Sequence, residues 1–327
     1  MKFKAYPITV KPILKEQVWG GHGLSSYIRL PKSRHIGEAW FLADQDGNDS
    51  VISSGYYRKW TIDSLIKRFP KEMLGKSAVK KYGRRFPLLF KFIDSKERLS
   101  IQVHPDDRFA RLHEGKTGKT ELWYIVESKP GSYMLAGLAG RYTGSAVKRL
   151  ALSGRLAGKM KKYSTKKGES YFIPAGTMHT LGPGNIVFEI QQNSDITYRL
   201  YDWGRKNLEV QRQLDIFKGA DSIKVLKDAG RIKVPAPRVK AGIKIRKIKE
   251  CPYFRVSEVT ALKYARYGHN KKAPVVLAVI QGKISIKGTD RPGHMFKKGD
   301  VVFLPYEYTG FIIGLERKTK MIVTEIR

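Results

Sequence analysis

The chain has 327 residues, of which 41% are hydrophobic and 11% aromatic, so it is long enough and apolar enough for two packed domains. Its single cysteine, Cys251, excludes an internal disulfide framework and a cysteine-rich zinc site. The 63 lysines and arginines outnumber the 29 aspartates and glutamates, which gives a formal net charge of +34. A field of this sign attracts anions, and nucleic acid is the first candidate.

The basic residues are spread along the whole chain rather than gathered in one arm. The densest cluster, residues 244–249, alternates with isoleucine and predicts a strand with one wet basic face. We therefore interpret the charge as a solvated surface rather than a nucleic-acid-binding one. No long uncharged apolar run predicts a membrane span, and the N-terminal residues lack the apolar core of a signal peptide, so we expect a cytoplasmic protein.

Most apolar runs are short and bounded by glycine, proline or asparagine, which is typical of β-strands. Two segments instead show helical spacing, residues 61–82 and 144–162, and each predicts one or two helices. The clearest predicted strands lie at residues 99–104, 122–126, 171–174 and 186–190. The sequence therefore predicts a mainly β protein with a small helical insertion in its first half.

A weak internal repeat indicates a duplicated β domain. Residues 166–174 (KKGESYFIP) match residues 297–305 (KKGDVVFLP) in type at each position, with a glycine turn followed by a strand that ends in proline. Such duplication is expected of jelly-roll folds. Between the copies, residues 234–239 (VPAPRV) form a plausible linker. We expect a larger domain over residues 1–235 and a smaller one over residues 236–327.

Four polar residues near predicted strand ends could form a metal site. Gln102 and His104 lie two apart in one predicted strand and therefore share a face. Glu121 opens the next strand, and His179 follows a tight turn that contains proline and glycine. Two imidazoles, a carboxylate and an amide oxygen suit zinc, and also iron, manganese, cobalt or nickel. The alternative is that Gln102 and Glu121 are exposed polar residues on alternating strands.

The second copy lacks this set of ligands. Gly310 or Phe311 stands where the first copy has His179, and no Gln-x-His precedes it. The sequence therefore predicts one metal site, in the first domain.

Several motifs then resemble a known family, type I mannose-6-phosphate isomerase (phosphomannose isomerase) in its short bacterial form, a member of the cupin superfamily. These motifs occur in the family's order and together span nearly the whole chain. They lie at residues 19–21 (WGG), 37–40 (GEAW), 100–107 (SIQVHPDD), 119–124 (KTELWY), 173–179 (IPAGTMH) and 197–203 (TYRLYDW). The exceptional basicity is unlike most members.

The resemblance implies a bicupin, that is, two jelly-roll barrels, and an enzyme that interconverts mannose 6-phosphate and fructose 6-phosphate. It implies one Zn²⁺ per chain, held by Gln102, His104, Glu121 and His179. Isomerisation moves a proton between C1 and C2 of the sugar through an enediol, so it needs a base and a group that stabilises an oxyanion.

The resemblance also implies the residues that act on the substrate. It places the family's active-site arginine at Arg199 and an active-site lysine at Lys119, whereas Lys91 and Ser100 match positions suited to the substrate's phosphate end. The base stays open between Lys119, a metal-bound water and Glu189, with Lys119 ahead. Two of these residues also have a purely structural alternative. Arg199 could pair with a neighbouring aspartate, and Lys91 could be an ordinary strand lysine that faces solvent.

Three other functions compete with this one. A catalytically silent cupin would bind a hexose 6-phosphate without turnover, a basic cupin would bind nucleic acid in a salt-sensitive way, and a related isomerase would act on glucose 6-phosphate. The expected partner is a small-molecule hexose 6-phosphate, without nucleic acid or membrane, and the chain is expected to be a monomer or a homodimer.

Overall fold

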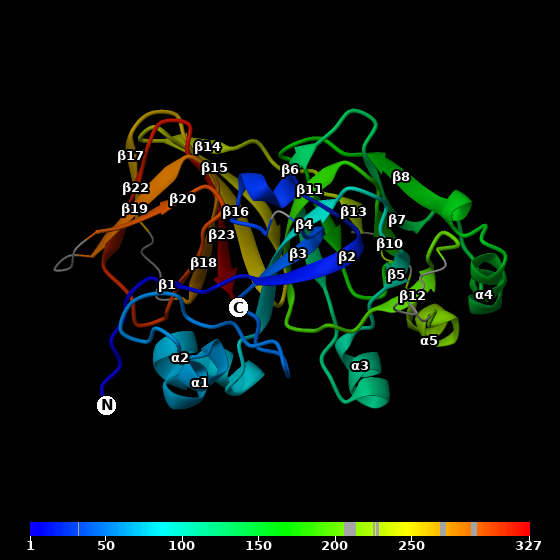
Figure 1. The fold of residues 1–327 in the computed structure, drawn as a ribbon, viewed down its shortest axis with the longest axis horizontal. Helices are drawn as coiled ribbons and strands as arrows, with labels where there is room; N and C mark the ends of the chain where they lie inside the picture. Colours follow the sequence, from blue (N-terminus) through cyan, green and yellow to red (C-terminus); the bar gives the residue numbers. More distant parts are fainter. Residues whose placement is uncertain (32, 206–213, 225, 227–228, 269–272, 289–292) are drawn as a thin grey trace.

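The computed structural model describes the whole chain except residues 32, 206–213, 225, 227–228, 269–272 and 289–292. Among the described residues, antiparallel sheets dominate, which confirms the predicted mainly β class. Figure 1 shows two β units side by side, with the helices at the periphery. None of the described helices has the length and apolar character needed to cross a membrane.

The first unit contains a seven-stranded and a five-stranded sheet. The first seven-stranded sheet has the order β13 (Gly230–Arg231), β9 (Ser170–Ile173), β6 (Glu121–Ser128), β11 (Asn185–Gln192), β4 (Leu88–Ser95), β3 (Ile36–Phe41), β2 (Ile13–Gly21). The five-stranded sheet has the order β12 (Tyr198–Tyr201), β5 (Ile101–Val103), β10 (His179–Leu181), β7 (Tyr133–Leu138), β8 (Met160–Ser164).

The second unit repeats this plan. The second seven-stranded sheet has the order β1 (Ile8–Thr9), β21 (Val301–Leu304), β18 (Val275–Gln281), β23 (Lys320–Ile326), β16 (Phe254–Ala261), β15 (Ile243–Glu250), β14 (Arg238–Lys240). The four-stranded sheet has the order β17 (Ala265–Gly268), β22 (Phe311–Leu315), β19 (Lys283–Gly288), β20 (His294–Lys297). Strands β9-β6-β11-β4-β3-β2 thus correspond in order to β21-β18-β23-β16-β15-β14, which supports the predicted duplication.

The four sheets form successive layers, because the residues of each strand alternate between two apolar clusters. In the first seven-stranded sheet, Trp123 and Val187 pack inward against the five-stranded sheet. On its other face, Phe90 and Phe188 pack with Phe303 of the second seven-stranded sheet. A separate cluster joins the second seven-stranded sheet to the four-stranded one.

The helices cover the outside of these layers. Helices α1 (Ile62–Arg68) and α2 (Pro70–Tyr82) lie over the joint between the two seven-stranded sheets, and α4 (Gly144–Leu152) and α5 (Ile216–Ser222) cover the five-stranded sheet. The remaining helical segments are η1 (Gly23–Ser26), α3 (Asp107–Glu114) and η2 (Ala157–Lys159). Thr61 caps α1 through its side chain, and Asp106 caps α3 in the same way.

The helical prediction for residues 144–162 extends too far. The α-helix ends at Leu152, η2 follows at Ala157–Lys159, and only the last predicted residues, 160–162, lie in β8, which pairs with β7. Pairing with a neighbouring strand overrides the local apolar spacing here.

The predicted division at residue 235 stays a prediction, but the sheets change close to it. Strand β13 still pairs with β9 of the first unit, whereas β14 pairs with β15 of the second. One segment departs from the division, because Ile8–Thr9 forms an edge of the second seven-stranded sheet, opposite Phe303 and Val302. The N-terminal segment therefore ties the two units together.

Candidate metal centre and substrate cavity

Strand alternation places the predicted ligands inside the first unit. In β5, Ile101 and Val103 point to the outer cluster under the helices, so Gln102 between them points inward. Glu121 opens β6 on the same face as the inward Trp123, and His179 opens β10 on the same face as the inward Leu181. Side chains from three strands thus converge between the two sheets.

Three of the predicted ligands are in direct contact. His179 Nε2 lies 3.1 Å from Glu121 Oε1, and His104 Nε2 lies 3.5 Å from Glu121 Oε2. The two imidazole rings are 4.9 Å apart between centroids, and all three side chains are buried. Their ligand atoms all lie within 4.8 Å of one another, which is close enough to hold a single ion.

Backbone carbonyls fix both imidazoles in the orientation that a metal needs. His104 Nδ1 donates to the main-chain oxygen of Ile196 at 2.8 Å, and His179 Nδ1 donates to that of Thr177 at 2.9 Å. Because a carbonyl can only accept, the proton of each neutral ring is on Nδ1 and the lone pair is on Nε2. Both Nε2 lone pairs face the Glu121 carboxylate.

Glu121 supplies the test of whether a cation fits. Its side chain is fully buried, and neither carboxylate oxygen has a hydrogen-bond partner among the described residues. A buried carboxylate without hydrogen bonds is costly unless a cation compensates it. Gln102 adds a fourth group, since its amide lies 3.3 Å from His179 Nε2 and its oxygen can turn toward the same point. The donor set therefore fits a divalent transition metal.

Lys119 lies directly against this cluster. Its Nζ is 3.2 Å from Glu121 Oε2 and 3.1 Å from His104 Nε2. Burial raises the pKa of Glu121, but neighbouring positive charge, from the Lys119 ammonium first, outweighs it and holds that pKa well below its usual range. Burial, with Lys119 second, lowers the pKa of His104 to about 3. The carboxylate is therefore charged and the His104 imidazole neutral, as metal ligands must be.

A cavity of about 320 Å³ opens beside the cluster. All five residues predicted to act on the substrate line it, and so does the predicted ligand Gln102. They are Lys91 of β4, Ser100 just before β5, Lys119 just before β6, Glu189 of β11 and Arg199 of β12. Their roles stay predictions, but the fold brings them to one place from five segments of the chain.

Two charged residues of this cavity, Glu38 and Asp195, were not predicted as site residues. Glu38 of β3 lines it and lies 3.5 Å from Lys91 Nζ, whereas Glu189 lies 3.2 Å from the same nitrogen on the other side. Trp40 Nε1 donates to Glu38 and Trp123 Nε1 donates to Glu189. Glu38 stands within residues 37–40, a segment that the family resemblance covers, but nothing local in that segment assigns it a role.

The same network sets the charge of the cavity wall. Burial lowers the pKa of Lys91, but the two carboxylates outweigh it and raise that pKa above its usual value. Burial raises the pKa of Glu38, but Lys91 outweighs it and lowers that pKa. With one cation between two anions, this wall has a net negative charge and offers both donors and acceptors to a polar ligand.

Comparisons with known proteins agree with this geometry. The family profile described as "Phosphomannose isomerase type I, catalytic domain" matches residues 8–135. Mannose-6-phosphate isomerase ManA of Bacillus subtilis is 33% identical over 322 residues, which cover 98% of this chain and 99% of that protein. A mannose-6-phosphate isomerase of Streptococcus mutans is 30% identical over 309 residues, which cover 92% of this chain and 93% of that protein.

The fold is similar as well. The crystal structure of the mannose 6-phosphate isomerase from Bacillus subtilis superposes with a TM-score of 0.88 and 32% identity, and the match covers 99% of this chain and all of that one. A structure from Archaeoglobus fulgidus has a TM-score of 0.78 at 18% identity, which shows the likeness of fold alone.

Proposed function

Because the chain belongs to the type I phosphomannose isomerase family, we propose that it interconverts mannose 6-phosphate and fructose 6-phosphate in the cavity beside Glu121. One observation carries the proposal. Arg199, Lys119 and Glu189 line one cavity, and this cavity lies beside the His–Glu–His cluster that could hold a metal ion. A binding module needs no such cluster of strongly interacting charges, whereas proton transfer next to a carbonyl does.

We assign Zn²⁺ as the resident metal, with Gln102, His104, Glu121 and His179 as its ligands. Two imidazole nitrogens, a carboxylate and an amide oxygen are a donor set that zinc accepts in catalytic sites. When bound, the ion supplies a Lewis acid that polarises the carbonyl and hydroxyl oxygens of the substrate.

Three side chains of the cavity are assigned to proton transfer, to the sugar hydroxyls and to charge stabilisation. In its neutral amine form, Lys119 takes the proton from C2 of the aldose to give the enediol and then returns it to C1, and the reverse transfer gives mannose 6-phosphate again. Both oxygens of Glu189 are already engaged, by Trp123 and Lys91, so Glu189 is placed better for sugar hydroxyls than for proton transfer. Arg199 stabilises the negative charge that develops on the sugar oxygen, because its guanidinium stays protonated.

Lys91 and Ser100 stay assigned to the phosphate end of the substrate. Ser100 is buried at the cavity wall and offers a hydroxyl donor. Lys91 already balances two carboxylates, so we expect it to bind through its N–H donors more than through net charge.

A coupled assay for fructose 6-phosphate formation from mannose 6-phosphate tests the function. We expect turnover that a chelator abolishes and that added Zn²⁺ restores, with about one zinc per chain measured by mass spectrometry in the active sample. Parallel reconstitution with Mn²⁺ or Co²⁺ tests the identity of the metal. Folded protein that binds the substrate but shows no turnover with any of these metals would contradict the proposal.

A further inference from the structure

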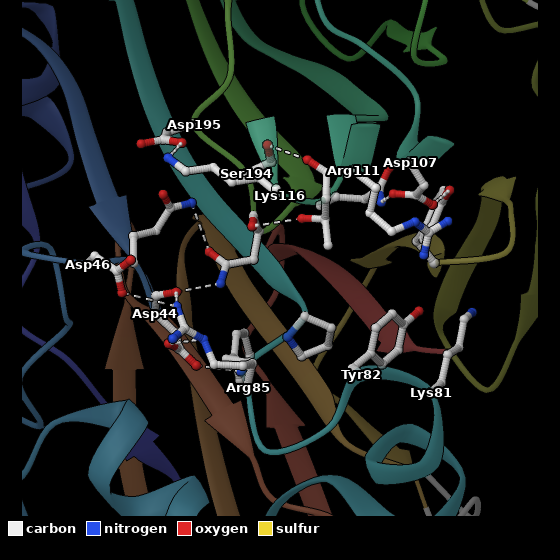
Figure 2. A pocket seen from close by; sticks show the side chains of 18 residues that line it. Asp44, Asp46, Lys81, Tyr82, Arg85, Asp107, Arg111, Lys116, Ser194 and Asp195 are labelled. Carbon is white, nitrogen blue, oxygen red and sulfur yellow. Dashed lines mark hydrogen bonds and ion pairs between the residues drawn. The ribbon is translucent and has the colours of Figure 1, made fainter. Parts of the chain in front are cut away.

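A second and larger cavity lies at the junction of the two units. Its volume is about 700 Å³, compared with about 320 Å³ for the catalytic cavity. We call it the junction pocket. It is lined by the loop after β3, the end of α2 and the loop from it to β4, α3 and its following loop, the end of β11 with the residues after it, and Tyr253 before β16. Figure 2 shows it from close by.

The carboxylates of the junction pocket are already compensated. Arg85 pairs with Asp44 at 3.0 Å and with Asp46 at 3.7 Å. Lys116 pairs with Asp195 at 3.0 Å. These residues form one side of the pocket and offer no excess of positive charge.

The fourth carboxylate, Asp107, is saturated with neutral donors. It accepts hydrogen bonds from Tyr253 Oη, from Gln192 Nε2 and from the main-chain nitrogen of Gly118. It therefore has little capacity left to pair with a cation.

Two cations of the pocket have no side-chain carboxylate partner among the described residues. Lys81 Nζ donates to the oxygens of Pro252 and of the terminal residue Arg327, and it lies over the rings of Tyr82 and Tyr253. Arg111 of α3 is exposed and has neither an ion pair nor a hydrogen bond in the described part of the chain. In Figure 2, Lys81, Tyr82 and Arg111 lie across the pocket from Asp44 and Asp46. Cationic and aromatic groups therefore share one wall of the concavity.

The opposite wall is suited to a hydroxylated ligand. Gln45 Nε2 donates to Asn193 Oδ1, and Asn193 Nδ2 donates to the main-chain oxygen of Asp44, so two amides are held in fixed orientations there. Fixed amides and carboxylates opposite aromatic rings are groups that can bind a polyol, and Arg111 and Lys81 can bind its anionic end.

We propose that the junction pocket binds a phosphorylated, hydroxyl-bearing small molecule, with its phosphate against Arg111 and Lys81. The forked donors of Arg111 and the compact ammonium of Lys81 suit the several oxygens of a phosphate. This site is separate from the catalytic cavity and goes beyond the proposed isomerase activity. The two cavities share only Asp195 among their lining residues, and the main-chain oxygen of the adjoining Ile196 orients the ligand His104.

The test compares two arginines on the same helix. Arg111 lines the pocket, whereas Arg108 is equally exposed on α3, has no ion pair among the described residues and lies outside the pocket. Inorganic pyrophosphate is titrated into the purified wild-type protein, Arg111→Ala and Arg108→Ala by calorimetry at about 0.15 M salt, where diffuse surface attraction is screened. We expect a saturable site whose affinity falls at least about tenfold in Arg111→Ala and less than about twofold in Arg108→Ala.

Ribose 5-phosphate and neutral ribose are then titrated in the same three proteins, to test the phosphate and the hydroxyls separately. We expect ribose 5-phosphate to bind with the same dependence on Arg111, and ribose alone not to bind there measurably. Equal losses in both arginine variants would show a general effect of net charge and overturn the proposal. Arg199→Ala is titrated as a fourth protein, and binding that survives in Arg111→Ala but disappears in Arg199→Ala would place the ligand in the catalytic cavity and also overturn the proposal. These titrations need no turnover, so they stand apart from the isomerase assay.

Discussion

The two units of this protein have nearly the same strand order but different chemistry at equivalent places. Glu121 opens β6 and faces Ile173 of β9, whereas Val275 opens β18 and faces Leu304 of β21. His179 opens β10, whereas Phe311 opens β22. Val275 and Phe311 belong to the apolar core of the second unit. A few side chains at strand starts therefore decide whether this scaffold encloses a polar site or a hydrophobic core.

The buried carboxylates of the two units make the same contrast. Glu258 of β16 accepts a hydrogen bond from Tyr124 Oη at 2.5 Å and one from Arg246 at 2.8 Å. Glu121 has no hydrogen bond within the described residues and faces two imidazole lone pairs and Lys119. The hydrogen bonds of Glu258 indicate a structural role. Glu121 lacks such bonds among the described residues, which makes it the candidate for a metal ligand.

The largest expected effect comes from removal of the Glu121 carboxylate. In Glu121→Ala, isomerase activity should fall at least about 10³-fold, because several kcal/mol of metal-dependent transition-state stabilisation are lost. The zinc content of the purified variant should fall with it. Measurement of both in one preparation tests the assignment, and a variant that keeps its zinc and its full rate would remove Glu121 from the metal site.

A smaller loss is expected for Arg199→Ala, which keeps every proposed ligand. Its kcat should fall about 10²- to 10³-fold, as for loss of one donor to a developing oxyanion. The zinc content should stay at the wild-type level, which separates this variant from Glu121→Ala. An unchanged kcat with a raised KM would instead assign Arg199 to substrate binding alone.

The next variant, Lys91→Met, tests the network of Glu38, Lys91 and Glu189 in the cavity wall. Loss of its donors should raise KM for mannose 6-phosphate about tenfold, with a smaller change in kcat. It also leaves Glu38 and Glu189 facing each other without a cation. Because Lys91 lowers the pKa of Glu38, the folded state gains stability above the usual glutamate pKa and loses it as the pH falls through the folded pKa.

Thermal unfolding of this variant therefore has a defined pH dependence. The wild-type protein should exceed Lys91→Met in Tm most at neutral pH, and the difference should shrink as the pH falls below the usual glutamate value of about 4.3. A difference in Tm that is constant over this range would mean that Lys91 contributes by packing rather than by charge.

The smallest effect on activity is expected in the second unit. Glu258→Ala removes the partner of Tyr124 and Arg246 and should destabilise the fold by about 2 kcal/mol, seen as a lower midpoint of urea unfolding. The specific activity of the folded fraction and its zinc content should stay within about twofold of wild type. Loss of zinc in this variant would show that the second unit supports the metal centre directly.

Local signals were sufficient for part of this structure. Short apolar runs bounded by turn residues predicted β6, β9 and β11, and the repeated glycine-strand-proline segment predicted the duplication. The spacing of Gln102 and His104 predicted a shared face, and both side chains do lie beside His179, although β5 ends at Val103 and His104 follows it. These features are encoded within a few residues, so they can be read without the rest of the chain.

Other features depended on contacts between distant segments. Glu38, Lys91 and Glu189 lie on three neighbouring strands, and only the pairing of β3, β4 and β11 makes them one network. The same holds for Ile8–Thr9 in the distant sheet, and for Lys81, Arg111 and Tyr253 around the junction pocket. The sequence by itself determined most strands, the repeat and the types of candidate ligand residue, whereas the tertiary structure decided which charges meet. Strand pairing and layer packing are set by burial across the whole molecule, which no local pattern records.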